Sequence, residues 1–208
     1  MNKVTVVEHP LLEDILSHLR EKSTPPRRFA EQMDAAGVVL GLEALRSAKT
    51  QTVQVSTPLK TAACRKLAQP VCLTAILRAG LGMMPGLARV LPEARMGHIG
   101  LYRNEETLNP VRYYVRLPSG LDKTLVLLLD PMLATGGSAA EAVRILKTDG
   151  AKEIAFVCLL ATRTGLRRVH REHPDVHIYA GAIDPVLNQN GYIVPGLGDA
   201  GDRTFGTI

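Results

Sequence analysis

The chain has 208 residues, of which 46% are hydrophobic and 22% are charged. This size and composition suit a globular protein with a substantial core, and they exclude a wholly disordered or fibrous chain. The formal net charge of +5 favours anionic partners, without choosing among phosphorylated small molecules, nucleic acid and membrane surfaces. The longest apolar run, residues 154–161, is far shorter than the ~20 residues that span a bilayer. We therefore expect a single domain over residues 1–208, located in the cytoplasm.

The first third of the chain is predicted to be helical. Apolar residues recur with a helical period from Leu11 to Leu19 and again from Phe29 to Ala44, with two prolines between these stretches. A helical N-terminal extension over residues 1–50 follows from this pattern. Residues 52–55 then have strand character.

From residue 70 onward, short apolar runs alternate with helical stretches. The predicted strands are Val71–Leu77, Met96–Tyr102, Thr124–Leu129, Ile154–Leu160 and Val176–Ala180. The predicted helices are Leu81–Leu91, Ser138–Asp149 and Gly165–Glu172. Continuous apolar strands separated by helices are typical of a parallel sheet covered on both faces. The fold class is therefore α/β, with a doubly wound parallel sheet.

Two segments break this alternation. Residues 103–122, which we call the flap segment, are polar and contain two prolines, so we expect either an excursion of the chain or a β-hairpin flap. Residues 184–208, the C-terminal segment, are rich in Gly and Pro and lack any period. They are predicted to form a long ordered loop, a feature that is often functional in a compact domain.

The most informative stretch runs from Leu125 to Ser138, where an apolar strand ends in Asp130 and a Thr-Gly-Gly-Ser loop opens a helix. Successive N–H groups in such a loop, together with the helix dipole, bind a phosphate monoester, and the hydroxyls of Thr135 and Ser138 can add donors. Asp130 repels phosphate but can accept hydrogen bonds from ribose 2′- and 3′-hydroxyls. The alternative is a plain turn in which Ser138 is the N-cap. The stretch has no Gly-Lys-Ser/Thr, so it is not a Walker loop.

An apolar strand that is followed by an acidic residue and then by Ala-Thr-Gly-Gly-Ser resembles the phosphoribosyl-diphosphate (PRPP) motif of type I phosphoribosyltransferases. Four blocks in the same order resemble the uracil phosphoribosyltransferase family more closely: residues 76–84, 102–108, 130–138 and 191–207. The last block is the most specific, because it separates uracil enzymes from purine enzymes. The resemblance implies the reaction of uracil with PRPP to give UMP and diphosphate in pyrimidine salvage. It also implies Mg²⁺, a homo-oligomer of at least two subunits and, in some members, a GTP effector.

The resemblance also assigns roles to residues. Arg78 lies in a diphosphate loop, Arg78-Ala79-Gly80, where a strained or cis peptide is expected, and Arg103 lies on the flap segment. Both would stabilise charge on the leaving diphosphate, and no residue is predicted to be a general base. The PRPP-binding residues besides these two are Asp130, Pro131, Met132, Leu133, Ala134, Thr135, Gly136, Gly137, Ser138 and Asp199. The uracil-binding residues are Ile193, Gly198, Asp199 and Ala200. No direct protein ligand to Mg²⁺ is expected, although Asp199 would reach it through water.

Some positions depart from the family pattern. Arg163, Pro185 and Asn190 stand where Pro, Gln and His are expected, which leaves subunit contacts and the response to effectors open. Arginines 163, 167, 168 and 171 form a basic stripe on one predicted helix, and this stripe is a solvated face, a subunit contact or an anion site.

Rival functions are less well supported. A related enzyme acting on another base is disfavoured by residues 191–207. An RNA-binding regulator is disfavoured by the modest net charge and by the lack of aromatic residues among the basic ones. A nucleotide kinase would need the P-loop lysine, which the sequence lacks.

Overall fold

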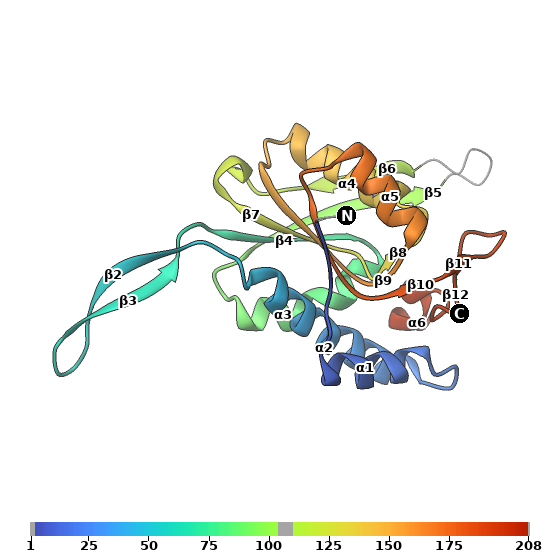
Figure 1. Cartoon of the computed structure of the whole chain (residues 1–208), viewed down its shortest axis with the longest axis horizontal. Helices are drawn as coiled ribbons and strands as arrows, with labels where there is room; N and C mark the ends of the chain where they lie inside the picture. The colour runs from blue at the N-terminus through green and yellow to red at the C-terminus, as the bar shows by residue number, and fades with distance from the viewer. Residues whose placement is uncertain (1–2, 104–109, 208) are drawn as a thin grey trace.

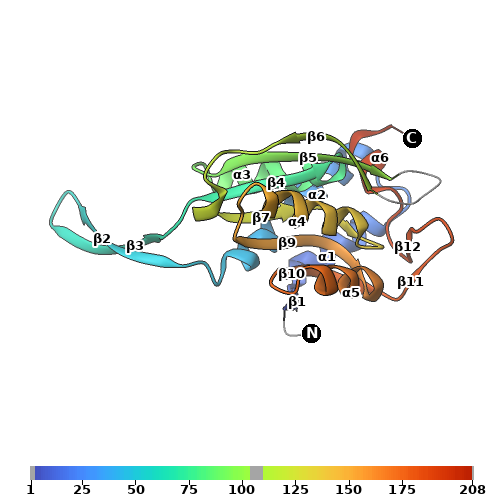
Figure 2. The same cartoon turned by 90° about the horizontal axis from the view of Figure 1, so that it is seen from above.

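A computed structural model describes residues 3–103 and 110–207. Its central sheet has the strand order β1-β10-β9-β7-β4-β5-β6, with β8 paired to β9 (Figure 2). Its strands are parallel, except that β6 runs antiparallel to β5. The bounds are β1 (Val4–Val6), β4 (Val71–Leu77), β5 (Arg95–Arg103), β6 (Pro110–Arg116), β7 (Leu125–Leu129), β8 (Met132–Leu133), β9 (Glu153–Thr162) and β10 (His177–Asp184).

The predicted central strands are confirmed, and their burial explains their sequences. All five residues of β7 are buried, as are the first six of β4. Because side chains alternate along a strand, Leu73 packs into the core on one face of the sheet and Cys72 into the core on the other. Both faces are therefore dry, which is why these strands are continuous apolar runs.

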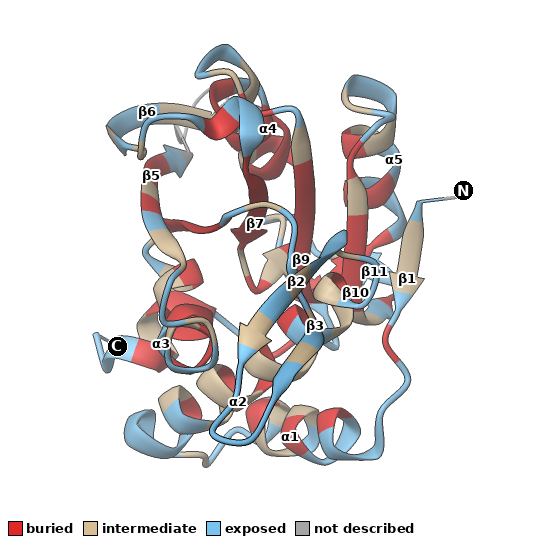
Figure 3. Cartoon of the chain, turned by 90° about the vertical axis from the view of Figure 1, so that its left-hand side faces the viewer, coloured by how far each residue is buried: buried red, intermediate tan, exposed pale blue. Residues whose placement is uncertain are grey.

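Helices cover both faces of the sheet, as a doubly wound fold requires (Figure 1). One face carries α1 (Pro10–Arg20), α2 (Pro26–Leu45), the 3-10 turn η1 (Ala79–Met83) and α3 (Met84–Val90). The other face carries α4 (Gly137–Thr148) and α5 (Arg163–Glu172). Figure 3 shows the buried residues of these helices turned toward the strands. The single helix predicted over residues 81–91 is instead η1 followed by α3.

Strands β2 (Thr50–Ser56) and β3 (Thr61–Leu67) form an antiparallel hairpin that projects from the body as an arm (Figures 1 and 2). The strand predicted at residues 52–55 is part of it, whereas β3 was not predicted. Leu59 at the tip of the arm is 96% exposed. The arm therefore has a separate two-stranded sheet and contributes little to the core.

The C-terminal segment contains regular elements, so the prediction of a long loop without them is wrong. Strand β10 extends to Asp184, and β11 (Val186–Leu187) pairs with β12 (Ile193–Val194) before α6 (Ala200–Phe205). These elements are too short to show a period in the sequence.

In the flap segment, β6 forms the predicted hairpin with β5, and η2 (Leu121–Lys123) follows it. Residues 104–109 of that segment lie outside the described residues. Within the part of the chain that the structure describes, no helix is both long and apolar enough to cross a membrane.

Candidate active site

A cavity of about 1060 Å³ opens at the carboxyl end of the central strands. Asp130 and the loop after it form one side, Ala79 of the diphosphate loop contributes to the wall, and residues 187–193 and 198–201 of the C-terminal segment complete it. Ligands of open α/β sheets bind at this end, where the strand order reverses. The position of the cavity agrees with the sequence-based prediction for Asp130.

The loop over residues 130–138, the phosphate loop, leads into the N-terminus of α4. Gly136 is the N-cap, with φ of +79° and without a hydrogen bond from a capping side chain. The interpretation in which Ser138 caps a plain turn is therefore wrong, because Ser138 lies inside the first turn of the helix. The first N–H groups of a helix have no intrahelical partner, so the first turn of α4 offers donors to an anion.

Gly136 also permits a close approach between two elements. A Cβ atom at this position would lie 2.8 Å from the carbonyl oxygen of Gly165 in α5. Both the positive φ and this contact exclude a larger residue. The phosphate loop is consequently packed directly against α5.

Asp130 follows β7 and lines the cavity. Burial raises the pKa of Asp130 to about 7, and a hydrogen bond from the Met132 backbone N–H opposes this rise only in part. Near neutral pH the carboxyl group is therefore divided between its neutral and charged forms. Hydroxyl donors from a ligand would favour the charged form.

The diphosphate loop begins with the expected cis peptide, between Leu77 and Arg78. The Arg78 guanidinium donates a hydrogen bond of 2.8 Å from Nη2 to Oδ1 of Asp202 in α6, and it lies 6.0 Å from the ring centre of Phe205. Thr207 also donates to Asp202, at 2.6 Å. A residue of the predicted leaving-group site is thus held by the C-terminal segment.

The uracil-binding residues predicted in the C-terminal segment lie together. Ile193 and Ala200 are buried, while Asp199 is exposed and caps α6 by accepting a hydrogen bond of 2.9 Å from the Asp202 N–H. Gly198 has φ of +81°, which favours glycine there.

Asp184 anchors the start of the C-terminal segment. Burial alone would raise the pKa of the Asp184 carboxyl, but hydrogen bonds from Arg20 and from the Gly196 N–H hold it below its usual value. Arg20 lies on α1, so the N-terminal helix is tied directly to the segment that contains the predicted base-binding residues.

The cavity brings together residues from two of the predicted groups. Asp130, Met132, Ala134, Thr135, Ile193, Gly198, Asp199 and Ala200 all line it. Pro131 and Leu133 are instead buried, Gly136 and Gly137 contact α5, and Ser138 is half-buried in α4. Arg103 ends β5, and its side chain lies outside the described part of the chain.

Two parts of the cavity wall were not named residue by residue in the sequence-based prediction, although the first lies in the C-terminal segment that was expected to be functional. Residues 187–192 line the cavity, and within them the Asn188 side chain accepts hydrogen bonds from the N–H groups of Asn190 and Tyr192. The Asn-Gln-Asn-Gly sequence is a turn signal that could have indicated this loop. Arg168 also lines the cavity, and its membership of the basic stripe was its sole signal.

The sequence profile described as uracil phosphoribosyltransferase matches residues 6–207. The chain belongs to the uracil phosphoribosyltransferase family. A relative of that name from Halalkalibacterium halodurans is 49% identical over 208 residues, with 100% of both chains covered. Another from Dictyoglomus turgidum is 50% identical over 205 residues, covering 98% of this chain and 99% of the relative.

Solved structures share the fold of this chain. A protein from Aquifex aeolicus has a TM-score of 0.93 at 35% identity, with 97% of each chain covered. An adenine phosphoribosyltransferase from Trypanosoma brucei has a TM-score of 0.58 at 15% identity, covering 86% of this chain and 83% of the other. The second similarity supports the fold alone. The fold is that of the type I phosphoribosyltransferases.

Proposed function

We propose that this chain transfers the 5-phosphoribosyl group from PRPP to uracil, forming UMP and diphosphate in pyrimidine salvage. Membership of the uracil phosphoribosyltransferase family supports the reaction. The observation that carries the site assignment is the single cavity that joins Asp130 and the phosphate loop to the C-terminal segment. One cavity can then hold the sugar phosphate and the base together.

The phosphate loop would hold the 5′-phosphate of PRPP. Its uncapped helix N-terminus supplies backbone donors and a favourable dipole. Asp130 would hold the ribose 2′- and 3′-hydroxyls, which donate to its charged form. Together these contacts fix the ribose, so that its C1 atom faces the base.

The leaving diphosphate needs stabilisation of its charge as the C1–O bond breaks. Arg78 and the N–H groups of the diphosphate loop would supply it, and Arg103 would add a second guanidinium from the flap segment. Closure of that segment would exclude water from the ribosyl centre. Positioning and charge stabilisation would then carry catalysis without a dedicated general base.

Uracil presents two carbonyl acceptors and an N3–H donor, which backbone groups can recognise. We assign this task to Ile193 and to the backbone of Gly198, Asp199 and Ala200. The positive φ of Gly198 supports close approach of the backbone to the base. Cytosine lacks this pattern, so the segment would discriminate against it.

Mg²⁺ also belongs to the proposed reaction. Among the described residues, no cluster of three or more His, Cys, Asp or Glu side chains could enclose a metal. The carboxylates of Asp130 and Asp199 in the cavity wall fit an ion held mainly by diphosphate oxygens and water, which is usual for Mg²⁺. Bound with PRPP, this ion would neutralise part of the diphosphate charge, with Asp199 reaching it through water.

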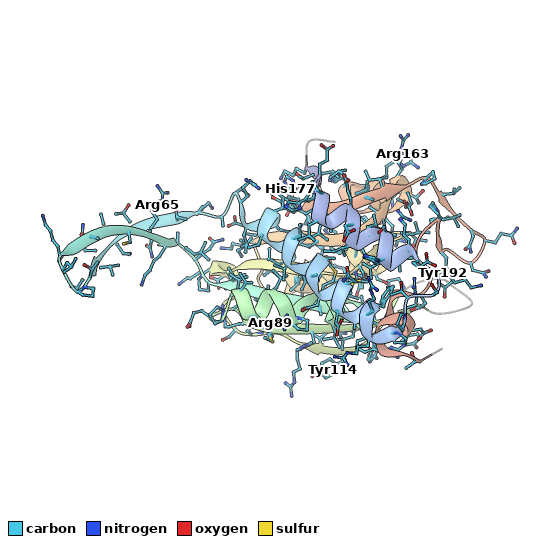
Figure 4. All side chains as sticks on the ribbon, turned by 90° about the horizontal axis from the view of Figure 1, so that it is seen from below. Arg65, Arg89, Tyr114, Arg163, His177 and Tyr192 are labelled. Atoms are coloured by element: carbon cyan, nitrogen blue, oxygen red, sulfur yellow. The ribbon has the colours of Figure 1, made fainter. Side chains whose placement is uncertain are left out.

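The reaction is tested by measuring UMP formation from uracil and PRPP with Mg²⁺, with cytosine, orotate and adenine in parallel. Product from uracil alone is expected. Arg78→Ala should lower kcat about 100- to 1000-fold. Arg89→Ala is the matched control, because that exposed arginine on α3 pairs with Asp34 and does not line the cavity (Figure 4). Product from another base, or from none, would contradict the proposal.

Three finer expectations are tested separately. The exposed Leu59 on the projecting arm supports a homo-oligomer in which the arm contacts a second copy, and sedimentation of the purified protein measures this. A GTP effector and a cytoplasmic location rest on the resemblance and composition. Rates of UMP formation with and without GTP, and fractionation of cells, test these two expectations.

A further inference from the structure

The basic stripe on α5 divides into two groups in the structure. Arg163, Arg167 and Arg171 are exposed, whereas Arg168 is half-buried and lines the cavity. Figure 4 shows Arg163 directed away from the body. Three arginines of the stripe thus face solvent, and Arg168 faces the same space as Asp130 and Thr135.

The guanidinium of Arg168 lies over the first turn of α4. Its Nε donates a hydrogen bond of 3.2 Å to Oε1 of Glu172, one turn along α5. A Cβ atom added to Gly137 would lie 3.2 Å from Nη1 and 3.7 Å from Cζ of Arg168. The ion pair uses Nε, and Nη1 lies next to the first turn of α4.

Helix α5 is fixed against the phosphate loop, which gives Arg168 a defined position. The hydroxyl of Thr162 donates a hydrogen bond of 2.6 Å to the Ala134 carbonyl and accepts one of 3.0 Å from the Gly165 N–H. A Cβ atom at Gly165 would lie 2.6 Å from the Leu133 carbonyl oxygen. The helix and the loop are therefore packed directly against each other.

We propose that Arg168 binds the 5′-phosphate of PRPP and UMP, adding a charged fork to the backbone donors of the phosphate loop. This inference rests on the proposed function of that loop. An anion at the N-terminus of α4 would lie within reach of the Nη atoms, and a guanidinium matches the geometry of phosphate oxygens. Glu172 holds the opposite side of the guanidinium and orients it.

The proposal makes a specific prediction about ligands. PRPP and UMP carry the 5′-phosphate, whereas uracil and diphosphate do not. Loss of Arg168 should weaken the binding of PRPP and UMP and leave the binding of uracil and diphosphate unchanged. If Arg168 had a merely structural role, its loss would weaken the binding of all four ligands.

The test measures binding of UMP by calorimetry, KM for PRPP and uracil, and inhibition by diphosphate. Arg168→Ala should weaken UMP binding and raise the KM for PRPP about 10- to 100-fold. Arg168→Lys should lose less, because it keeps the charge without the fork. Arg167→Ala, on the exposed side of the same helix, is the matched control and should match the wild type. Arg168→Gln serves as a second neutral variant if the alanine variant is poorly folded.

Two results would overturn the assignment. In the first, both neutral variants bind UMP as tightly as the wild type does. In the second, their affinity for uracil and diphosphate falls to the same extent as their affinity for UMP. Failure of the proposed function gives a different result. A wild-type protein that binds UMP but forms none from uracil and PRPP would contradict the reaction, while the comparison of variants would still decide the role of Arg168.

Discussion

The charged form of the Asp130 carboxyl, which the proposed function needs, lowers the stability of the fold. Its pKa is about 7 in the folded chain, against 3.8 for an ordinary aspartate. Below pH 4 both the folded and unfolded states carry the proton, so the buried neutral acid is tolerated. As pH rises from 4 to 7, the unfolded state releases the proton first, and the free energy of unfolding falls. The charged form that the proposed contacts with ribose hydroxyls would need is thus the one that the fold disfavours.

Asp130→Asn should therefore stabilise the free protein at pH 8 while abolishing UMP formation. Asparagine has no charge to bury, so the gain at pH 8 should be between about 1 and 4 kcal/mol, and it should vanish at pH 4. Thermal melting at the two pH values measures it. Asp122→Asn, at an exposed position, should change neither melt. An equal gain at both pH values would contradict the explanation by burial.

The ion pair between Arg78 and Asp202 predicts that removing Asp202 lowers kcat/KM for PRPP less than removing Arg78 does. Both side chains are partly exposed, so their ion pair contributes little to stability. The pair holds Arg78 beside α6, and under the proposed function diphosphate would compete with Asp202 for the guanidinium. Asp202→Asn should lower kcat/KM for PRPP a few-fold with an unchanged melting temperature, far less than Arg78→Ala. Steady-state kinetics decide this, and a loss as large as that of Arg78→Ala would count against it.

At the scale of elements, Thr162 joins the end of β9 to α5 and the phosphate loop. It is 2% exposed and is the N-cap of α5. Thr162→Ala should cost about 2 kcal/mol of unfolding free energy, since it removes a cap and leaves the Ala134 carbonyl without its donor. UMP binding should weaken too, because α5 carries Arg168. Urea unfolding measures the loss of stability, and calorimetry measures the loss of affinity for UMP. Thr162→Ser, which keeps the hydroxyl, should show a smaller loss of stability and of affinity.

The elements that sequence reasoning found are those long or apolar enough to show a pattern. Strand β7 was predicted because it is buried on both faces, while β11 and β12 have two residues each and show no period. The helix predicted over residues 81–91 divides into η1 and α3, and Pro85, which lacks an N–H, lies in the first turn of α3. Strand β3 was missed because none of its residues is buried, so its sequence has no strongly apolar face.

At the scale of the whole molecule, the sequence predicted the parts of the site that are contiguous in the chain. It missed the parts that the tertiary fold brings together from distant positions. Asp130 and residues 135–138 form one local motif, so their chemistry can be inferred from spacing. Arg168 enters the cavity because α5 packs on the phosphate loop, and Asp202 meets Arg78 across 124 residues of sequence. Such contacts leave no local pattern in a single sequence.

The pair between Arg20 and Asp184 likewise depends on the tertiary fold, and it joins α1 to the segment that is proposed to bind the base. Arg20 donates from Nη2 to Oδ1 of Asp184 at 2.7 Å and from Nη1 to Oδ2 at 2.8 Å. Arg20 also donates to the Gly196 carbonyl at 2.8 Å, and the Gly196 N–H donates to Asp184. Because Asp184 is 4% exposed, removing Arg20 would leave a buried carboxylate without its counter-ion.

Arg20→Met should therefore lower the free energy of unfolding by about 3–5 kcal/mol at pH 7. The folded pKa of Asp184 is depressed, so the contribution of the pair is present above pH 4 and is lost as pH falls through that pKa. The difference between variant and wild type should consequently shrink in acid. KM for uracil should rise more than KM for PRPP, since Gly196 lies between Ile193 and Gly198, two of the predicted base-binding residues. Arg27→Met, which breaks an exposed pair with Glu31, should cost less than about 1 kcal/mol, and an equal cost for both variants would show that the N-terminal helix does not support the site.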